Sequence, residues 1–280
     1  MGGPADRATC QDAGVSDEHL HHVIHPGTGP HALLLHGALG SRSYWDDNLP
    51  ALAAVCRPVV IELWGHGRSP SPTDPSRYEP EAYADEINHL VDQLGGAPVW
   101  LIGQSMGAAL MMHYALGHPE RVIGLVITNS SSAFAVPETW QERNRTMVAE
   151  RVAEVEQHGV EILRDSWINP GRSRRISEAV RAELAAEFGE HTDEGIIGSF
   201  RYTNYSLPLG DRLTEIAVPT LLTNGTDEER FQDLLHRVAL VPGIEVVDLP
   251  ASHAVNAHDP EGWNAATVAF MEGIGSGSVG

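Results

Sequence analysis

The sequence predicts an α/β fold in which a mostly parallel central sheet is flanked by helices and interrupted by an inserted helical cap. Three observations lead to this prediction. Short apolar runs recur along the 280-residue chain, amphipathic stretches of helical length separate them, and this alternation stops between about Ala133 and Leu209. Strands that alternate with helices are typical of parallel sheets, because two parallel neighbours need a long crossover between them.

Each expected strand is a short apolar run bounded by glycine, proline or polar residues, which is the pattern of a strand buried on both faces. These runs are Ala32–Leu35, Pro58–Leu63, Pro98–Ile102, Val122–Thr128, Pro219–Thr223 and Glu245–Leu249. Between them, Tyr83–Leu94 repeats apolar residues at helical spacing. Helices are also expected at Met106–Leu116 and Phe231–Val241.

The stretch from residue 133 to residue 210 contains no good strand candidate, so we interpret it as the cap. The core would then be made of residues 1–132 and 211–280. Within the cap, helices are expected at Glu138–His158, Val160–Trp167, Ser177–Phe188 and Glu194–Tyr205.

Charge and composition exclude several classes of function. The formal net charge of −20 would repel phosphate backbones, so no nucleic-acid partner is expected. All 18 basic residues are arginine, which excludes lysine Schiff-base enzymes and P-loop NTPases. No apolar run reaches the ~18 residues that a membrane helix needs. We also expect no signal peptide, and the two cysteines, Cys10 and Cys56, fit a reducing compartment, which favours the cytoplasm.

The motif Gly103-Gln104-Ser105-Met106-Gly107 lies between an expected strand and an expected helix. A sharp turn from strand to helix strains the backbone at Ser105 and admits only small neighbours, which accounts for the two glycines. The serine hydroxyl would stand at the carboxyl edge of the sheet and at a helix N-terminus, which favours a developing anion. Ser105 is therefore the candidate nucleophile.

A serine needs a base to remove its proton, and the base needs an acid to orient it. His253 follows the last expected strand, so it should lie at the same edge. The other histidines are mostly expected at the surface, for example His19, His21 and His22. The next-to-last strand leads to Asp227 and Glu228, and either carboxylate could be the acid.

An oxyanion formed from the substrate carbonyl needs two backbone N–H donors. The Met106 N–H, directly after the nucleophile, is one candidate. The other should come from the loop after Ala32–Leu35, which reads His36-Gly37-Ala38-Leu39-Gly40. We expect Ala38 to supply it.

Taken together, these motifs make the sequence resemble the α/β-hydrolase superfamily, in particular its capped esterases and meta-cleavage hydrolases. The marks of this resemblance are His36-Gly37, Gly65-His66-Gly67-Arg68-Ser69, Gly103–Gly107, Gly225–Glu228 and Ser252-His253. The resemblance implies the α/β-hydrolase fold, a cap over the active site, and an oxyanion donor at Ala38. Its usual spacing places the acid at Glu228, but aspartate is the commoner acid, so Asp227 stays open.

We therefore expect a serine hydrolase that cleaves a carboxylic ester or lactone of a small, largely apolar substrate, without a metal or organic cofactor. A C–C bond hydrolase of a ring-cleavage product would use the same triad. A related menaquinone-pathway lyase would too, although residues 106–109 lack the arginine that such lyases have after the nucleophile. A ligand-binding relative without catalysis is the alternative outside enzymes.

The cap provides the candidate substrate-binding residues. Trp140, Trp167 and Tyr205 could line an apolar pocket or form the cap's own core. Arg143 could bind a substrate carboxylate or pair with a nearby glutamate. The expected partner is a small-molecule substrate, with no nucleic acid and no membrane, and the chain would be a monomer or a homodimer.

Overall fold

The central sheet has eight strands in the order β1-β2-β4-β3-β5-β6-β7-β8. Strands β1 and β2 are antiparallel to their neighbours, and all the others are paired in parallel. This computed structural model describes residues 11–12 and 18–277. The strands are β1 (Gln11–Asp12), β2 (His22–Ile24), β3 (His31–Leu35), β4 (Arg57–Ile61), β5 (Val99–Gly103), β6 (Val122–Thr128), β7 (Thr220–Gly225) and β8 (Glu245–Leu249).

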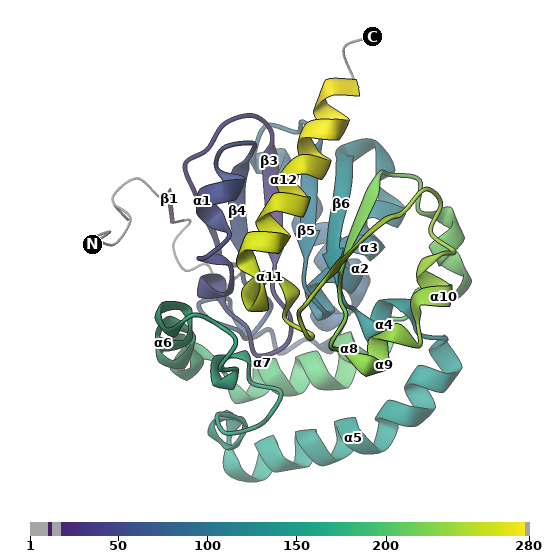
Figure 1. Cartoon of the computed structure of the whole chain (residues 1–280). Coiled ribbons are helices and arrows are strands. Elements are labelled where there is room, and N and C mark those ends of the chain that lie inside the picture. Colours follow the sequence, from purple (N-terminus) through teal and green to yellow (C-terminus); the bar gives the residue numbers. More distant parts are fainter. Residues whose placement is uncertain (1–10, 13–17, 278–280) are drawn as a thin grey trace.

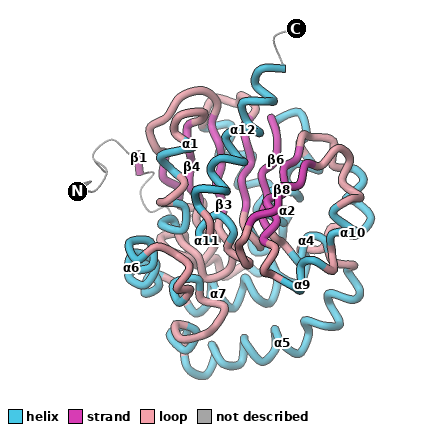
Figure 2. The backbone as a smooth tube through the Cα atoms, viewed as in Figure 1, coloured by secondary structure: helices cyan, strands magenta, loops and turns pink. Residues whose placement is uncertain are grey.

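Helices cover both faces of the sheet (Figures 1 and 2). Alternate residues of each strand point to opposite faces. On β3, Leu33 and Leu35 pack with α2 and α3, whereas Ala32 and Leu34 pack with α1, α11 and α12. The helices of the two layers are α1 (Leu49–Leu52), α2 (Pro80–Gln93), α3 (Met106–Gly117), α9 (Glu229–Gln232), α10 (Leu235–Val238), α11 (Val255–His258) and α12 (Pro260–Gly277).

Residues 133–210, which we call the helical segment, contain no strand. Figure 1 shows α5, α6 and α7 gathered at one end of the sheet, where α4 follows β6. The helices are α4 (Ser131–Phe134), which leads into the segment, α5 (Pro137–His158), α6 (Glu178–Glu187), α7 (Asp193–Gly198) and α8 (Asn204–Ser206). The segment has its own apolar cluster, and Leu39 of the core packs into it.

The predicted α/β fold with a mostly parallel sheet is confirmed, and each expected strand lies within two residues of an observed one. The single helix expected at Phe231–Val241 is wrong, because the chain forms α9 and α10 instead. In one continuous helix, the Arg237 N–H would donate to the Asp233 carbonyl. Here the Arg237 N–H donates to the Leu234 carbonyl, and the His236 ring donates to the Asp233 carbonyl. The helix expected at Val160–Trp167 is only the short 3₁₀ turn Val160–Leu163.

Strands β1 and β2 escaped prediction because they are two and three residues long. No helix in the described ranges is both long and apolar enough to cross a membrane. Cys56 is buried and has a free thiol, and Cys10 lies outside the described residues.

Candidate active site

Ser105 lies on a strained turn between β5 and α3, with φ 53° and ψ −114°. In the part of the chain that the structure describes, only Ser105 and Leu39 combine a side chain with a positive φ. A Cβ on Gly103 would lie 2.5 Å from the Ala108 Cα atom, and a Cβ on Gly107 would lie 2.2 Å from the Leu35 oxygen. Both glycines are therefore needed for helix α3 to begin this close to the sheet.

His253 follows β8 and connects Ser105 to a carboxylate. Its Nε2 atom lies 2.8 Å from Ser105 Oγ, and its Nδ1 atom lies 2.9 Å from Glu228 Oε1. A carboxylate can only accept, so the ring proton is on Nδ1, which leaves the Nε2 lone pair free to accept from the serine hydroxyl. The His253 side chain is 45% exposed, so a substrate can reach it from solvent.

Of the two carboxylates that the sequence left open, the structure places Glu228 on the His253 ring. Asp227 turns outward, where its Oδ2 atom accepts a hydrogen bond from Arg175 Nη1 at 2.7 Å, and both side chains are substantially exposed. The geometry therefore corrects the inclusion of Asp227 in the candidate site.

Asn129, at the end of β6, contacts the other oxygen of Glu228. Its Nδ2 atom donates to Glu228 Oε2 at 2.8 Å and to the Gly225 carbonyl at 3.2 Å. Its Oδ1 atom accepts the Gly225 N–H at 3.0 Å. Asn129 is fully buried, so these contacts fix both the carboxylate and the turn that carries it. The sequence indicated the position only by a polar residue directly after a buried strand.

Two further side chains hold the backbone around the site. Gln104 Nε2 donates to the His253 carbonyl at 3.3 Å, and Ser130 Oγ donates to the Ser105 carbonyl at 2.7 Å. Both are buried. The strand ends β5, β6 and β8 are therefore tied together beside the nucleophile. Sequence reasoning missed both residues, although Gln104 occupies the variable position directly before the serine.

The loop after β3 passes beside Ser105. A Cβ on Gly37 would lie only 3.0 Å from Ser105 Cβ, so the loop and the nucleophile are in van der Waals contact. Within the described ranges, the Ala38 and Met106 N–H groups donate to no protein acceptor, whereas those of Leu39 and Gly40 do. Two free donors thus flank the serine, as an oxyanion site requires.

The four candidate substrate-binding residues lie in different surroundings. Trp140 is partly buried, and its indole N–H donates to the Asn204 carbonyl at 2.8 Å. Tyr205 is also partly buried, whereas Arg143 is exposed and Trp167 is 77% exposed. Among the described side chains, none of these four is hydrogen-bonded to the triad. Their role in binding stays a prediction.

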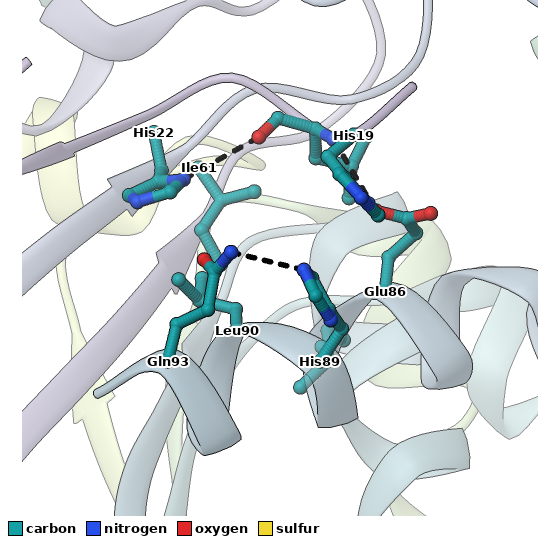
Figure 3. A pocket seen from close by; sticks show the side chains of 9 residues that line it. His19, His22, Ile61, Glu86, His89, Leu90 and Gln93 are labelled. Atoms are coloured by element: carbon teal, nitrogen blue, oxygen red, sulfur yellow. Dashed lines mark hydrogen bonds and ion pairs between the residues drawn. The ribbon is translucent and has the colours of Figure 1, made fainter. Parts of the chain in front are cut away.

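The expectation that His19, His21 and His22 all lie at the surface is wrong for His21. Its side chain is buried, and its ring nitrogens lie 2.8 Å from an Asp12 oxygen and 2.9 Å from a Glu62 oxygen. His21 directly precedes β2, and its carbonyl accepts the N–H of Glu62, which directly follows β4. Figure 3 shows His19 and His22 around a small hollow that is also lined by Glu86, His89 and Gln93 of α2. No triad residue lines it. Its volume of about 20 Å³ is room for little more than one water molecule. Across the described part of the chain, no three His, Cys, Asp or Glu side chains are grouped as metal ligands.

Known proteins resemble this chain in sequence and in structure. A family model described as alpha/beta hydrolase fold matches residues 30–155. A Bacillus subtilis (strain 168) protein, provisionally assigned as 2-succinyl-6-hydroxy-2,4-cyclohexadiene-1-carboxylate synthase, is 27% identical over 261 residues, which cover 89% of this chain and 93% of that protein.

Two solved structures show the same fold. MenH from S. aureus superimposes with a TM-score of 0.80 at 18% identity, covering 91% of this chain and 99% of that one. The enol-lactonase from Burkholderia xenovorans LB400 superimposes with a TM-score of 0.76 at 23% identity, covering 90% and 96%. From the sheet order, the turn at Ser105 and these matches, we conclude that the chain has the α/β-hydrolase fold and that its residues 30–155 match the model of that family.

Proposed function

We propose that this protein is a serine hydrolase that cleaves a carboxylic ester or lactone of a small, largely apolar molecule through an acyl-enzyme. The observation that carries the proposal is the continuous hydrogen-bonded chain from Ser105 through His253 to Glu228. The accessible ring of His253 and the strained backbone of Ser105 support it, because strain in a well-packed structure clusters at functional sites.

In the proposed reaction, Ser105 Oγ attacks the substrate carbonyl while His253 Nε2 takes its proton. Glu228 holds the imidazole and stabilises its positive charge. The N–H groups of Ala38 and Met106 donate to the oxyanion of the tetrahedral intermediate. When that intermediate collapses, the C–O bond breaks and His253 protonates the leaving alcohol. His253 then deprotonates a water molecule, which hydrolyses the acyl-enzyme and regenerates the serine. These steps call for no metal or organic cofactor.

The helical segment would act as the cap that selects the substrate. The inner face of α5 is formed by Asn144, Val148, Val152 and Val155, which are buried. Trp140 lies one turn before Asn144 and so on the same face. Trp140 is thus the residue of this set best placed to line an apolar pocket. Its indole N–H donates to the Asn204 carbonyl of α8, and Tyr205 is the next residue of that helix. Arg143 and Trp167 would meet only a substrate that reaches the outer rim.

The test is hydrolysis of p-nitrophenyl acetate and butyrate by the wild type and by Ser105→Ala. The variant should lose at least about a thousandfold in kcat while its circular dichroism and Tm match the wild type. Asp227→Asn is a matched control, because it changes a carboxylate beside the site that does not touch His253. Unchanged turnover in Ser105→Ala would remove the proposal.

The similarity to the Bacillus subtilis protein favours one second candidate, a lyase that uses the same triad. The absence of an arginine among residues 106–109 argues against it. Product analysis separates the two candidates. Release of alcohol and acid from esters supports the hydrolase. Formation of the product named in the description of that relative, without ester turnover, supports the lyase.

A further inference from the structure

Leu39 connects the loop beside Ser105 to the helical segment. It follows Ala38 and has φ 57°, a conformation that costs a residue with a side chain of order 1 kcal/mol or more. Its side chain is 2% exposed and packs in the apolar cluster of the segment, with members of α5 and α7. Such a conformation persists only where the surroundings fix it from several directions.

Two histidines hold the backbone of Leu39. His66 Nε2 accepts the Leu39 N–H at 3.2 Å, and His191 Nε2 lies 3.4 Å from the Leu39 carbonyl. The His36, His66 and His191 rings form a buried row, with centroids 5.4 Å and 5.1 Å apart. His36 begins the loop that carries the Ala38 N–H, and the other two rings contact Leu39 of the same loop.

The contacts of each ring define its protonation. His66 accepts from Leu39 on one nitrogen and donates to the Trp64 carbonyl from the other, at 2.9 Å. His191 Nδ1 accepts the Gly67 N–H at 3.1 Å, so its other nitrogen carries the proton and donates to Leu39. Every ring that accepts a backbone N–H must be neutral.

His36 follows the same rule. Its Nε2 atom accepts the Leu63 N–H at 3.3 Å, and its Nδ1 atom donates to the Gly37 carbonyl at 2.7 Å. Burial lowers the pKa of all three histidines, that of His191 to about 4. The carboxylates of Glu62 and Glu190 act on this row and raise the pKa of its rings. Burial, and the repulsion that a protonated ring would meet from its neighbours, outweigh them and keep the rings neutral.

Only His191 of this row belongs to the helical segment, and it lies where the backbone of the segment contacts the backbone of the core. The Thr192 N–H donates to the Gly65 carbonyl at 3.1 Å. A Cβ on Gly195 would lie 2.1 Å from the Gly65 Cα atom, so the two backbones touch. This contact sets the position of His191 relative to loop 36–40.

We propose that His191 is a positioning residue for the oxyanion donor, because it fixes Leu39 and thereby the direction of the neighbouring Ala38 N–H. The helical segment is then part of the machinery that stabilises the oxyanion, as well as a cover for the substrate. This inference rests on the proposed function for its catalytic meaning, but the coupling from His191 to residues 38 and 39 is a structural claim that can be measured by itself.

The test compares His191→Phe and His191→Gln with the wild type. Phenylalanine keeps the ring and its packing but offers neither donor nor acceptor. Glutamine can accept from Gly67 and donate to Leu39. His158→Phe is the matched control, because this histidine is exposed at the end of α5 in the same segment.

In p-nitrophenyl butyrate hydrolysis, His191→Phe should lose about 10- to 100-fold in kcat with little change in KM. Affinity for an alkyl boronic acid, which forms a tetrahedral adduct on the serine, should fall in parallel. Glutamine should restore most of both, and His158→Phe should match the wild type. A kcat for His191→Phe within twofold of the wild type, or a glutamine variant as poor as phenylalanine, would overturn the proposal.

Nuclear magnetic resonance makes the outcome independent of the proposed function. The backbone amide signals of Ala38 and Leu39 should shift in His191→Phe and return toward their wild-type positions in His191→Gln. If these signals stay in place in His191→Phe, the proposal is wrong whether or not the protein hydrolyses esters. Ser105→Ala, assayed alongside, shows separately whether the proposed function fails.

Discussion

The amide of Asn129 holds the Glu228 oxygen that faces away from His253. Asn129 Nδ2 lies 2.8 Å from Glu228 Oε2, while Oε1 of the same carboxylate lies 2.9 Å from His253 Nδ1. A glutamate side chain has one more rotatable bond than an aspartate, and contacts at both oxygens remove that freedom. This clamp explains how the longer acid can orient the imidazole.

Asn129→Leu should lower kcat by about tenfold or more, because one oxygen of Glu228 loses its donor and the buried Gly225 N–H loses its acceptor. Asn129→Asp gives a more specific signature. A carboxyl at this position can donate to Glu228 only when it is protonated, and two ionised carboxylates would repel each other. Its activity relative to the wild type should therefore fall as pH rises. Identical pH–rate profiles would show that the contact does not matter.

Exchanging each carboxylate for its amide separates the two acids. Glu228→Gln should lower kcat by about 10⁴, as losing the triad acid does elsewhere, because the imidazolium loses its counter-charge. Asp227→Asn should stay within twofold of the wild type, since Asp227 pairs with the exposed Arg175. Steady-state kinetics on p-nitrophenyl butyrate measures both, and equal losses would show that the two carboxylates share the role.

The contact between Gly65 and Gly195 predicts a large effect of a single methyl group. Gly195→Ala places a Cβ 2.1 Å from the Gly65 Cα atom, so one backbone must move, and we expect a loss of about 1–3 kcal/mol or more in the free energy of unfolding. Gly117→Ala in α3 is the control, because the new Cβ meets nothing within 4 Å. The free energy of unfolding should rise by about 0.5–1 kcal/mol in this variant. Urea unfolding followed by circular dichroism checks both, and a neutral Gly195→Ala would contradict the close contact.

The buried histidines make stability depend on pH in a defined direction. Burial lowers the pKa of His191 to about 4, from its ordinary value of 6.5. The unfolded chain therefore binds more protons than the folded one between these values. The stabilisation is complete above pH 6.5 and falls as pH drops towards 4, by about 3 kcal/mol for His191.

The same window contains other groups. His36 and His66 act in the same direction as His191. For His21, burial opposes protonation, but the contacts with Glu62 and Asp12 prevail and raise the pKa, so His21 offsets part of the loss. Contacts from His21 and the Arg68 N–H outweigh burial and lower the pKa of Glu62 to about 2, so Glu62 loses its effect mainly below this window. Tm measured from pH 7 to pH 4.5 should fall, and less steeply in His191→Gln. A flat Tm would contradict the account.

The sequence predicted those site residues that come directly after a strand. Ser105, His253 and the pair Asp227 and Glu228 each follow a strand, and strand ends of a parallel sheet meet at one edge. The spacing of the resemblance favoured Glu228 but left Asp227 open, because neighbours in a turn point in different directions that only the packing decides. Asn129 lies 99 residues from Glu228, so their contact had no local signal.

The helical segment was the least predictable part. Its helices were expected from apolar spacing, but that pattern does not say which face meets the core. Trp167 shows this, because its expected helix ends as a short 3₁₀ turn and its side chain is 77% exposed. His191 gave no signal at all, since its partners Leu39 and Gly67 come from loops of the core more than a hundred residues away.

The central claim is that the His253 imidazole turns the Ser105 hydroxyl into a nucleophile. The most direct test is peptide mass spectrometry of the protein after treatment with a fluorophosphonate, comparing the rate of labelling in the wild type and in His253→Ala. We predict one adduct per chain, on Ser105, with labelling at least about a thousandfold slower in His253→Ala. An adduct on another residue, or equal rates in the two proteins, would contradict the account.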